Sequence, residues 1–268
     1  MMGKLLTFWR YSVDFLKHGE FHYFLSSIKY MLTGKPSRHA GIYTSSLGKF
    51  QVRAGTLDFQ FGNYAYEWGV KKFVYKNIHN YNKFLDIGAN IGTYSILFAK
   101  EGLDGCAFEP VDTNFEVLKK NIELNNLEKK VKLVNLALGK HEHNDIFTFV
   151  PDNTGASHLK SIENKDVKDG GETRVKVVTL DSMIDQCGFD PEKDKVFIKI
   201  DVEGMETNVL EGARNFLKSF PEIMMVMESV HSGKDHLSKL LKDIDDRFEI
   251  LEVDDLNMGA VKSTRDQK

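Results

Sequence analysis

The chain has 268 residues, enough for one large α/β domain with a short extension, and its 41% apolar and 28% charged residues are typical of a globular protein. A net charge of −3 gives no overall field suited to a nucleic-acid backbone, so no nucleic-acid partner is expected. The two cysteines, Cys106 and Cys187, form no CxxC or Cys/His cluster, which excludes the common zinc motifs and favours reduced thiols in a cytoplasmic protein.

Residues 1–46 are predicted to form an N-terminal helical extension. Apolar residues recur there at helical spacing, namely Leu5, Leu6, Trp9, Val13 and Leu16. The charges among them make a poor secretory signal, and no apolar run in the chain approaches the length of a membrane span. Residues 1–40 carry six basic residues against two acidic ones, a net +4, which suits a basic amphipathic segment lying on a membrane. A helical cap over a binding site, or a dimer contact, is the alternative interpretation.

The remainder, 47–268, is predicted to be one domain. After a strand at 49–55 and a helix at 64–78, strands and helices alternate. Strands are expected at 83–88, 105–110, 131–138, 195–201, 222–229 and 247–254. Helices are expected at 93–101, 112–126 with Asp112 as N-cap, 205–219 and 235–244. Apolar strands separated by helices indicate an α/β fold with a doubly wound, mostly parallel, Rossmann-like sheet. The polar, alternating segment 141–178 predicts a β-rich insertion.

The stretch "LDIGANIG" has an unusual composition for the end of a core strand. Ligands bind at the carboxyl ends of strands in such sheets, so Asp86, Gly88 and Asn90 fall where a site is expected. Gly88 would allow a sharp turn and a close approach to the backbone. The spacing Gly88-x-x-x-Gly92 is not the dinucleotide fingerprint GxGxxG, and an acid just before the glycine suits an amine or a sulfonium better than a phosphate.

A second acid lies at the end of the next strand, in "FEP". Glu109 follows Asp86 at about the spacing at which an acid bonds both hydroxyls of a ribose. One acid for a cationic amino-acid moiety and another for a ribose together describe S-adenosylmethionine. Helix packing by the glycines, with Glu109 as a surface carboxylate, is the alternative.

Several segments, in order, resemble the FkbM-type methyltransferases, which are class I enzymes dependent on S-adenosylmethionine. These segments are "FLDIGANIGTYS", "FEPVDTNFEVLKKNIELN", "ALG", "VTLDSMI" and "FIKIDVEGMETNVLEGA". The resemblance covers about 83–229 and implies O-methylation of a hydroxyl, often on a sugar of a glycan, glycolipid or natural product. Only a short tail follows the strand at 247–254, so the closing antiparallel hairpin of the family is expected to be abbreviated, with "MGAV" as its remnant.

The resemblance also assigns the cofactor-binding residues. Asp86, Gly88, Ala89 and Asn90 would hold the methionine end of the cofactor. Glu109, with Pro110 beside it, would bind the ribose. Leu136 and Ala137, at the end of the third core strand, would flank the adenine.

The segment "IKIDVEGME" supplies three candidates for the chemistry of transfer. Lys199 and Asp201 are two residues apart and point to one face of a strand. We expect Asp201 to accept the acceptor's proton or to orient the hydroxyl, and Glu203 to bind the acceptor. A buried Lys199–Asp201 ion pair is one alternative; a second is that this pair lowers the pKa of Lys199 and makes the lysine the base.

The fifth core strand ends in "MESVHSG", which places Glu228 and His231 at the same rim. His231 is a candidate base near neutral pH, although a loop histidine is more often solvated. Asp201, Glu203 and Glu228 together would suit a magnesium ion, but their spacing does not demand one, and no metal is assigned.

Two further segments are candidates for contacting the acceptor. The loop "PDNTGASHL", with Asn153, Gly155, Ser157 and His158, would suit closure over a hydroxyl-rich acceptor, or be an ordinary hairpin. The aromatic residues Tyr64, Tyr66 and Trp68 would stack on a sugar or belong to the core.

Three other classes of function remain open. A nicotinamide-dependent oxidoreductase is disfavoured by the missing GxGxxG. A non-catalytic module binding an adenosine compound and a methyltransferase acting on protein or RNA are the alternatives, with RNA the weaker because no basic domain is appended. A small-molecule or carbohydrate acceptor is the preferred partner.

Overall fold

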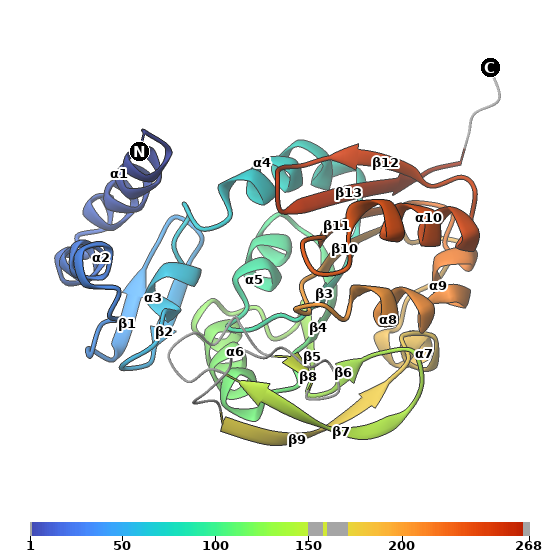
Figure 1. The fold of residues 1–268 in the computed structure, drawn as a ribbon, viewed down its shortest axis with the longest axis horizontal. Helices are drawn as coiled ribbons and strands as arrows, with labels where there is room; N and C mark the ends of the chain where they lie inside the picture. The colour runs from blue at the N-terminus through green and yellow to red at the C-terminus, as the bar shows by residue number, and fades with distance from the viewer. Residues whose placement is uncertain (1, 150–157, 160–170, 265–268) are drawn as a thin grey trace.

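The computed structural model describes residues 2–149, 158–159 and 171–264. The chain begins with helices α1 (Met2–Lys17) and α2 (Phe21–Thr33), as the helical spacing predicted. A two-stranded hairpin, β1 (Gly41–Thr44) with β2 (Lys49–Val52), and the short helix α3 (Asp58–Phe61) follow. Figure 1 shows this N-terminal part beside the main body, with α1 and α2 outermost. The hairpin spans the boundary expected between residues 46 and 47.

A seven-stranded sheet forms the centre of the described structure, in the order β12-β13-β11-β10-β3-β4-β5. Its strands are β3 (Lys83–Ile87), β4 (Asp104–Phe108), β5 (Val131–Val134), β10 (Val196–Ile200), β11 (Ile223–Glu228), β12 (Glu249–Glu252) and β13 (Asn257–Lys262). The five strands from β11 to β5 pair in parallel, whereas β13 is antiparallel to both β11 and β12. This confirms the predicted mostly parallel, doubly wound sheet.

The expectation of an abbreviated closing hairpin was wrong. Strand β13 is six residues long and pairs along its whole length with β11, from Asn257 opposite Glu228 to Lys262 opposite Ile223. The segment "MGAV" is the middle of this strand and not a remnant. It is buried between two neighbouring strands, which explains its apolar and small residues.

Helices cover both faces of the sheet (Figure 1). One face packs against α4 (Trp68–Asn77), α5 (Thr93–Lys100) and α6 (Asp112–Leu124). The other face packs against α8 (Glu206–Glu211), α9 (Arg214–Ser219) and α10 (Lys234–Ile244), with the one-turn helix α7 (Ile184–Cys187) nearby. Strand residues alternate between the two cores, because Phe84 joins the first cluster and Leu85 the second.

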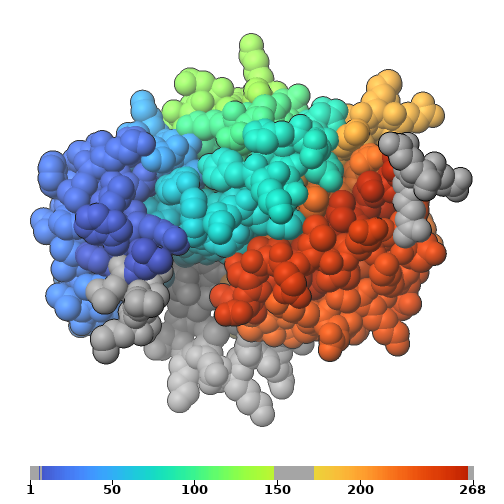
Figure 2. All heavy atoms as spheres, turned by 90° about the horizontal axis from the view of Figure 1, so that it is seen from above, coloured from blue at the N-terminus to red at the C-terminus, as the bar shows by residue number. Residues whose placement is uncertain are grey.

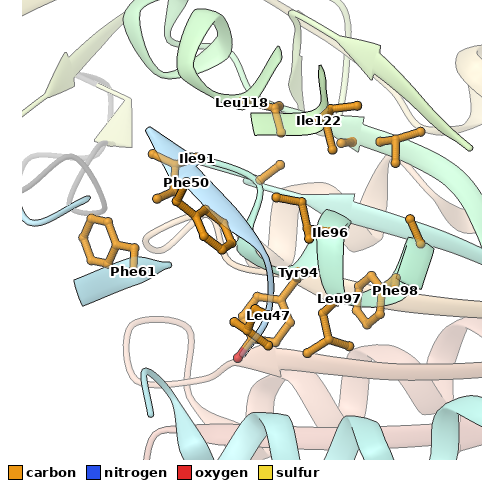
Figure 3. Close-up of a cluster of buried hydrophobic side chains, with 14 of the residues drawn as sticks. Leu47, Phe50, Phe61, Ile91, Tyr94, Ile96, Leu97, Phe98, Leu118 and Ile122 are labelled. Carbon is orange, nitrogen blue, oxygen red and sulfur yellow. The ribbon is translucent and has the colours of Figure 1, made fainter. Parts of the chain in front are cut away.

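The N-terminal hairpin is part of the first core. Figure 3 shows Leu47 and Phe50 close to Tyr94, in the first turn of α5, and to Ile91 just before that helix; all four are buried in one cluster. Burying large apolar side chains stabilises by about 1.5–3 kcal/mol each, which fixes the hairpin to the helices that cover this face of the sheet. The segment that follows the hairpin is therefore held at the edge of the candidate site.

The insertion forms a separate small sheet in the order β6-β9-β7-β8. Its strands are β6 (Ala137–Leu138), β7 (His143–Phe149), β8 (His158–Leu159) and β9 (Gly171–Val178), which confirms a β-rich insertion. The single strand predicted at 131–138 is in fact two strands, β5 and β6, in different sheets. Between them Asn135 donates a hydrogen bond to the Glu109 carbonyl oxygen (3.0 Å), which anchors the chain where it leaves the main sheet.

Two helix predictions needed correction. Asp112 is not the N-cap of α6 but its first residue; Val111 is the N-cap, and its N–H donates to the Glu109 carboxylate. The helix predicted at 205–219 is broken into α8 and α9 near Gly212. A side chain at Gly212 would lie 1.9 Å from the carbonyl oxygen of Gly139, so the helix pair approaches the insertion's backbone as closely as a glycine allows.

Candidate active site

A cavity of about 310 Å³ opens at the carboxyl ends of the parallel strands, where ligands bind in open α/β sheets. Four strands deliver residues to it: Ile87 ends β3, Phe108 ends β4, Asp201 follows β10 and Glu228 ends β11. The insertion contributes Phe147. The N-terminal segment contributes Leu57, Gln60, Phe61, Tyr66 and Glu67.

The loop after β3 is shaped by a close backbone approach at Gly88. Its φ is +83°, and a Cβ there would lie 1.9 Å from the backbone carbonyl oxygen of Asp201. The N–H groups of Gly88 and Ala89 both donate to the Phe108 carbonyl oxygen (3.0 and 2.9 Å). Only a glycine fits this position, so Gly88 joins the ends of β3, β4 and β10 into one rigid rim.

Glu109 is an acid of the cavity whose two carboxylate oxygens are both held by hydrogen bonds. Its carboxylate is buried and accepts two backbone N–H groups, from Asn90 (2.8 Å) and Val111 (3.0 Å). Burial raises the pKa of Glu109 to about 7, even though these hydrogen bonds favour the charged form. Arg53, held by Asp58 at 2.8 Å, adds a nearby positive charge. Both carboxylate oxygens are thus fixed in place, and each keeps capacity to accept a hydroxyl.

An apolar wall stands next to Glu109. Pro110, Leu136 and Ala137, three of the residues assigned to the cofactor by the resemblance, line the cavity there, and Phe108 and Leu138 complete the wall. The wall exists because the chain turns out of the main sheet between β5 and β6. Apolar side chains beside an acid with two fixed oxygens can hold a flat, apolar base and an attached sugar diol.

Asp86 and Ala89 do not line this cavity. Asp86 is 1% exposed, points toward α5 and accepts a hydrogen bond from the Ser95 hydroxyl (2.5 Å). Burial raises its pKa to about 6, and the ammonium of Lys199, its neighbour in register on β10, opposes that shift. The positively charged group that Asp86 meets in the structure is therefore Lys199.

Lys199 and Asp201 form an ion pair, with Nζ and Oδ2 2.7 Å apart; Lys199 is buried, whereas Asp201 is 27% exposed, so the pair considered from the sequence is only partly buried. Burial alone would lower the pKa of Lys199, but the carboxylates of Asp201, Glu67 and Asp86 outweigh it and raise that pKa above its ordinary value. This direction argues against the alternative in which Lys199 becomes the base through a lowered pKa. Its ammonium also lies 4.5 Å from the ring centre of Tyr94, so it acts as a fixed positive charge.

Three more predicted residues gather beside Asp201. Glu203 and Glu228 line the cavity, and His231 Nε2 lies 3.5 Å from Glu203 Oε2. Burial, followed by the negative charge of Asp201, raises the pKa of Glu203 to about 8 and that of Glu228 to about 7. The Glu228 Oε2 atom is buried and has no hydrogen-bond partner among the described residues. These carboxylates are held close against their mutual repulsion.

The same three side chains satisfy the spacing of a cation site. One ligand atom from each of Glu203, Glu228 and His231 lies within 4.8 Å of the others. The magnesium set considered from the sequence had Asp201 in place of His231; in the structure Asp201 is instead engaged by Lys199.

Sequence reasoning missed the contribution of the segment before α4. Glu67 lines the cavity. Its backbone is in the left-handed region (φ 48°), and burial raises the pKa of its carboxyl. Lys71, one turn into α4, is fully buried, and burial lowers its pKa to about 7. The sequence signal that could have revealed this segment is the acid Glu67 among the aromatic residues of "YAYEWG".

Three aromatic residues of this segment were candidates for stacking on a sugar. Tyr66 lines the cavity, whereas the ring of Tyr64 packs on that of Trp68, with ring centres 4.9 Å apart. The loop residues Asn153, Gly155 and Ser157 lie outside the described residues, as does the side chain of His158.

The sheet order, the helices on both faces and the cavity at the strand ends, with an acid closing the second parallel strand, define the class I methyltransferase fold. The chain belongs to the methyltransferase FkbM domain family, whose profile matches residues 86–254. S-adenosylmethionine is the cofactor of this family of enzymes, and a nicotinamide-dependent oxidoreductase is set aside.

Two relatives and two solved structures illustrate the likeness. Hexuronic acid methyltransferase AglP of Haloferax volcanii is 27% identical over 160 residues, which are 59% of this chain and 60% of AglP. Methyltransferase sdnD of Sordaria araneosa is 28% identical over 176 residues, 53% of this chain and 68% of sdnD. The methyltransferase FkbM structure from Methylobacillus flagellatus has a TM-score of 0.47 at 19% identity, covering 68% of this chain and 44% of that one. A SAM-dependent methyltransferase from Agrobacterium tumefaciens has a TM-score of 0.48 at 7% identity, covering 84% and 70%.

Proposed function

We propose that this chain is an S-adenosylmethionine-dependent O-methyltransferase whose acceptor is a hydroxyl on a sugar of a glycan, glycolipid or natural product. The observation that carries the proposal is that one cavity joins the fixed carboxylate of Glu109 to a second cluster of carboxylates around Asp201. The first suits the cofactor's ribose, and the second suits an acceptor rich in hydroxyls. The relative AglP, named for a hexuronic acid, supports a sugar as the acceptor.

The residues of the first cluster fit the cofactor. Glu109 would accept both ribose hydroxyls, and the apolar wall would flank the adenine. Gly88 and Asn90 would hold the methionine end, where the buried Oδ1 of Asn90 has no hydrogen-bond partner among the described residues. Asp86 and Ala89, which do not line the cavity, would support the loop that follows β3. When bound, S-adenosylmethionine supplies an electrophilic methyl group.

The second cluster has to orient the acceptor hydroxyl and take its proton. Asp201 is the candidate for that proton, and the ammonium of Lys199 at 2.7 Å holds its carboxylate in place. Glu228, with an unpartnered oxygen facing inward, and Glu203 with His231 would bind neighbouring hydroxyls. The side chains from the N-terminal segment, above all Tyr66, would cover the acceptor from the opposite side.

The test follows the methyl group. The full chain is incubated with methyl-labelled S-adenosylmethionine and with separated glycan, lipid, protein and RNA fractions of its host. Label in the glycan or lipid fraction, lost in Asp201→Asn and kept in the exposed control Asp255→Asn, supports the proposal. Label confined to protein or RNA, or no label in any fraction while the cofactor still binds, contradicts it. A parallel incubation with a chelator tests the cation site: activity lost on chelation and restored by magnesium would support a cation at Glu203, Glu228 and His231, and unchanged activity would count against it.

A further inference from the structure

The two N-terminal helices turn apolar side chains toward solvent. Of the twelve large apolar residues that are exposed in the described part of the chain, eight lie on α1 and α2. On α1 they follow one stripe at helical spacing: Leu6, Trp9, Val13 and Leu16. On α2 they are Phe21, Leu25, Met31 and Leu32, with exposed fractions from 53% to 74%. So many on two adjacent helices form a patch, which single exposed apolar residues do not.

The opposite faces of these helices, which pack on the protein, combine aromatic and polar side chains: Phe15 of α1 is fully buried in the first core, beside Tyr23 of α2. The buried residues of α2 are Tyr23, Ser26 and Ser27. On α1, Asp14 is 3% exposed and accepts hydrogen bonds from the N–H groups of Ser46 and Tyr64, both at 3.0 Å. A helix in water ordinarily buries its apolar stripe and exposes its polar face. Here buried aromatic contacts and hydrogen bonds together dock the helices, while eight large apolar side chains still face solvent.

The charges are sorted in the same way. Asp14 and Glu20 are the acids of residues 1–40, and both are turned inward, Glu20 accepting the N–H of Thr44 at 2.7 Å. The basic residues Lys17, Lys29, Lys35 and Arg38 are exposed. This face therefore combines apolar and basic side chains, while the chain as a whole carries −3. Figure 2 shows the N-terminal segment, in blue, forming one end of the molecule.

We propose that α1 and α2 form a surface that binds an anionic lipid bilayer, with the helices lying in the interface. The charge pattern selects this occupant. Anionic headgroups neutralise the exposed lysines, and the apolar stripes enter the acyl boundary. A second copy of the chain would instead place the same basic face opposite itself. None of the helices in the described residues is long and apolar enough to cross a membrane, so these two would bind along the surface. The proposal does not depend on the transferase assignment.

The test is flotation of the full chain with vesicles of phosphatidylcholine alone or with phosphatidylglycerol added. Binding is expected only to the anionic vesicles and should weaken as salt is raised. Replacing two exposed apolar residues, Trp9→Ser with Leu32→Ser, should lower the partition coefficient about tenfold for each residue. The matched control, Ile250→Ser with Leu256→Ser, changes exposed apolar residues outside these helices and should bind like the wild type.

Fluorescence gives a second readout that misfolding would not imitate. The chain has two tryptophans, and Trp68→Phe leaves Trp9 as the reporter, which is 64% exposed. Its emission should shift to shorter wavelength on anionic vesicles and stay unchanged with phosphatidylcholine alone. No flotation with anionic vesicles, or equal flotation of the Trp9/Leu32 variant, overturns the proposal. A dimer that the same variant breaks, without any vesicle binding, would assign the surface to a second copy.

Discussion

The half of the cavity proposed for the cofactor, around Glu109, and the half proposed for the acceptor, around Asp201, are built on different principles. Around Glu109 a carboxylate is fixed by two backbone N–H groups, and the loop that supplies one of them is locked by Gly88. Around Asp201 the order comes from side chains: one ammonium, from Lys199, faces several acids. In the first half, both carboxylate oxygens of Glu109 already accept a hydrogen bond from the backbone. In the second half the acids have raised pKa values, and Oε2 of Glu228 has no hydrogen-bond partner within the described part of the chain, so a ligand's hydroxyls would complete this half.

Gly88→Ala should break both halves at once, because the loop of the first half touches the backbone of the second. A Cβ 1.9 Å from the Asp201 carbonyl oxygen forces the backbone to move, and the positive φ adds strain. We expect the free energy of unfolding to fall by about 3 kcal/mol or more, with cofactor binding and transfer both lost.

Urea unfolding measures this loss, and Gly102→Ala is the matched control. Gly102 also has a positive φ (+104°), but no atom lies within 4 Å of its added Cβ. It should lose only about 1–2 kcal/mol from backbone strain. Equal losses in the two variants would mean that the contact with Asp201 does not join the halves.

Asp201→Asn should impair methyl transfer while leaving cofactor binding intact. The asparagine is nearly the same size but cannot take a proton, so methyl transfer should fall by about a hundredfold to ten-thousandfold. Affinity for S-adenosylhomocysteine, the demethylated product, should stay within about twofold, because the cofactor half does not use this carboxylate. Turnover and calorimetry measure the two effects. Retained turnover would remove Asp201 from proton transfer.

The smallest expected effect is the pH dependence of the cofactor half. Glu109 has a pKa of about 7 in the free protein, and hydroxyl donors favour its charged form, so binding lowers that pKa. Affinity for S-adenosylhomocysteine should therefore rise by a few-fold to about tenfold between pH 6 and pH 8 and then level off. The stability of the ligand-free protein changes in the opposite direction. Because the pKa of Glu109 is raised in the folded state, this residue lowers the free energy of unfolding as pH rises from about 4.5 to about 7. Glu109→Gln should flatten the first profile; a slope that persists in this variant would place the titrating group elsewhere.

Local sequence signals predicted the sheet and most of the cavity well. Strands with apolar runs, such as β3 (Lys83–Ile87), could be recognised by themselves, and their alternation with helices predicted parallel pairing, although not their order in the sheet. Gly88, Asn90 and Glu109 could be found because they stand at strand ends, where their composition is out of place in a core. The closing hairpin was underestimated because its second strand, β13, is short of the β-branched residues that usually mark strands.

What the sequence could not show depends on contacts between distant segments. Asp86 was expected to face a ligand. Side chains of β3 alternate between the two faces of the sheet, and that of Asp86 lies on the face covered by α5, where it accepts a hydrogen bond from Ser95. The raised pKa of Lys199 depends first on Asp201 and next on Glu67, which comes from a segment more than a hundred residues earlier. The docking of α1 likewise depends on where Asp14 finds its partners.

The most direct test of the central claim is a calorimetric titration of S-adenosylhomocysteine into the wild type and Glu109→Gln at pH 8. The claim is that the cofactor lies at the ends of β3 and β4, with Glu109 on its ribose. It predicts one site per chain in the wild type and an affinity about tenfold to a hundredfold lower in the variant, the cost of weakened hydrogen bonds to a charged group. No binding to the wild type, or equal affinity in the two proteins, would contradict it.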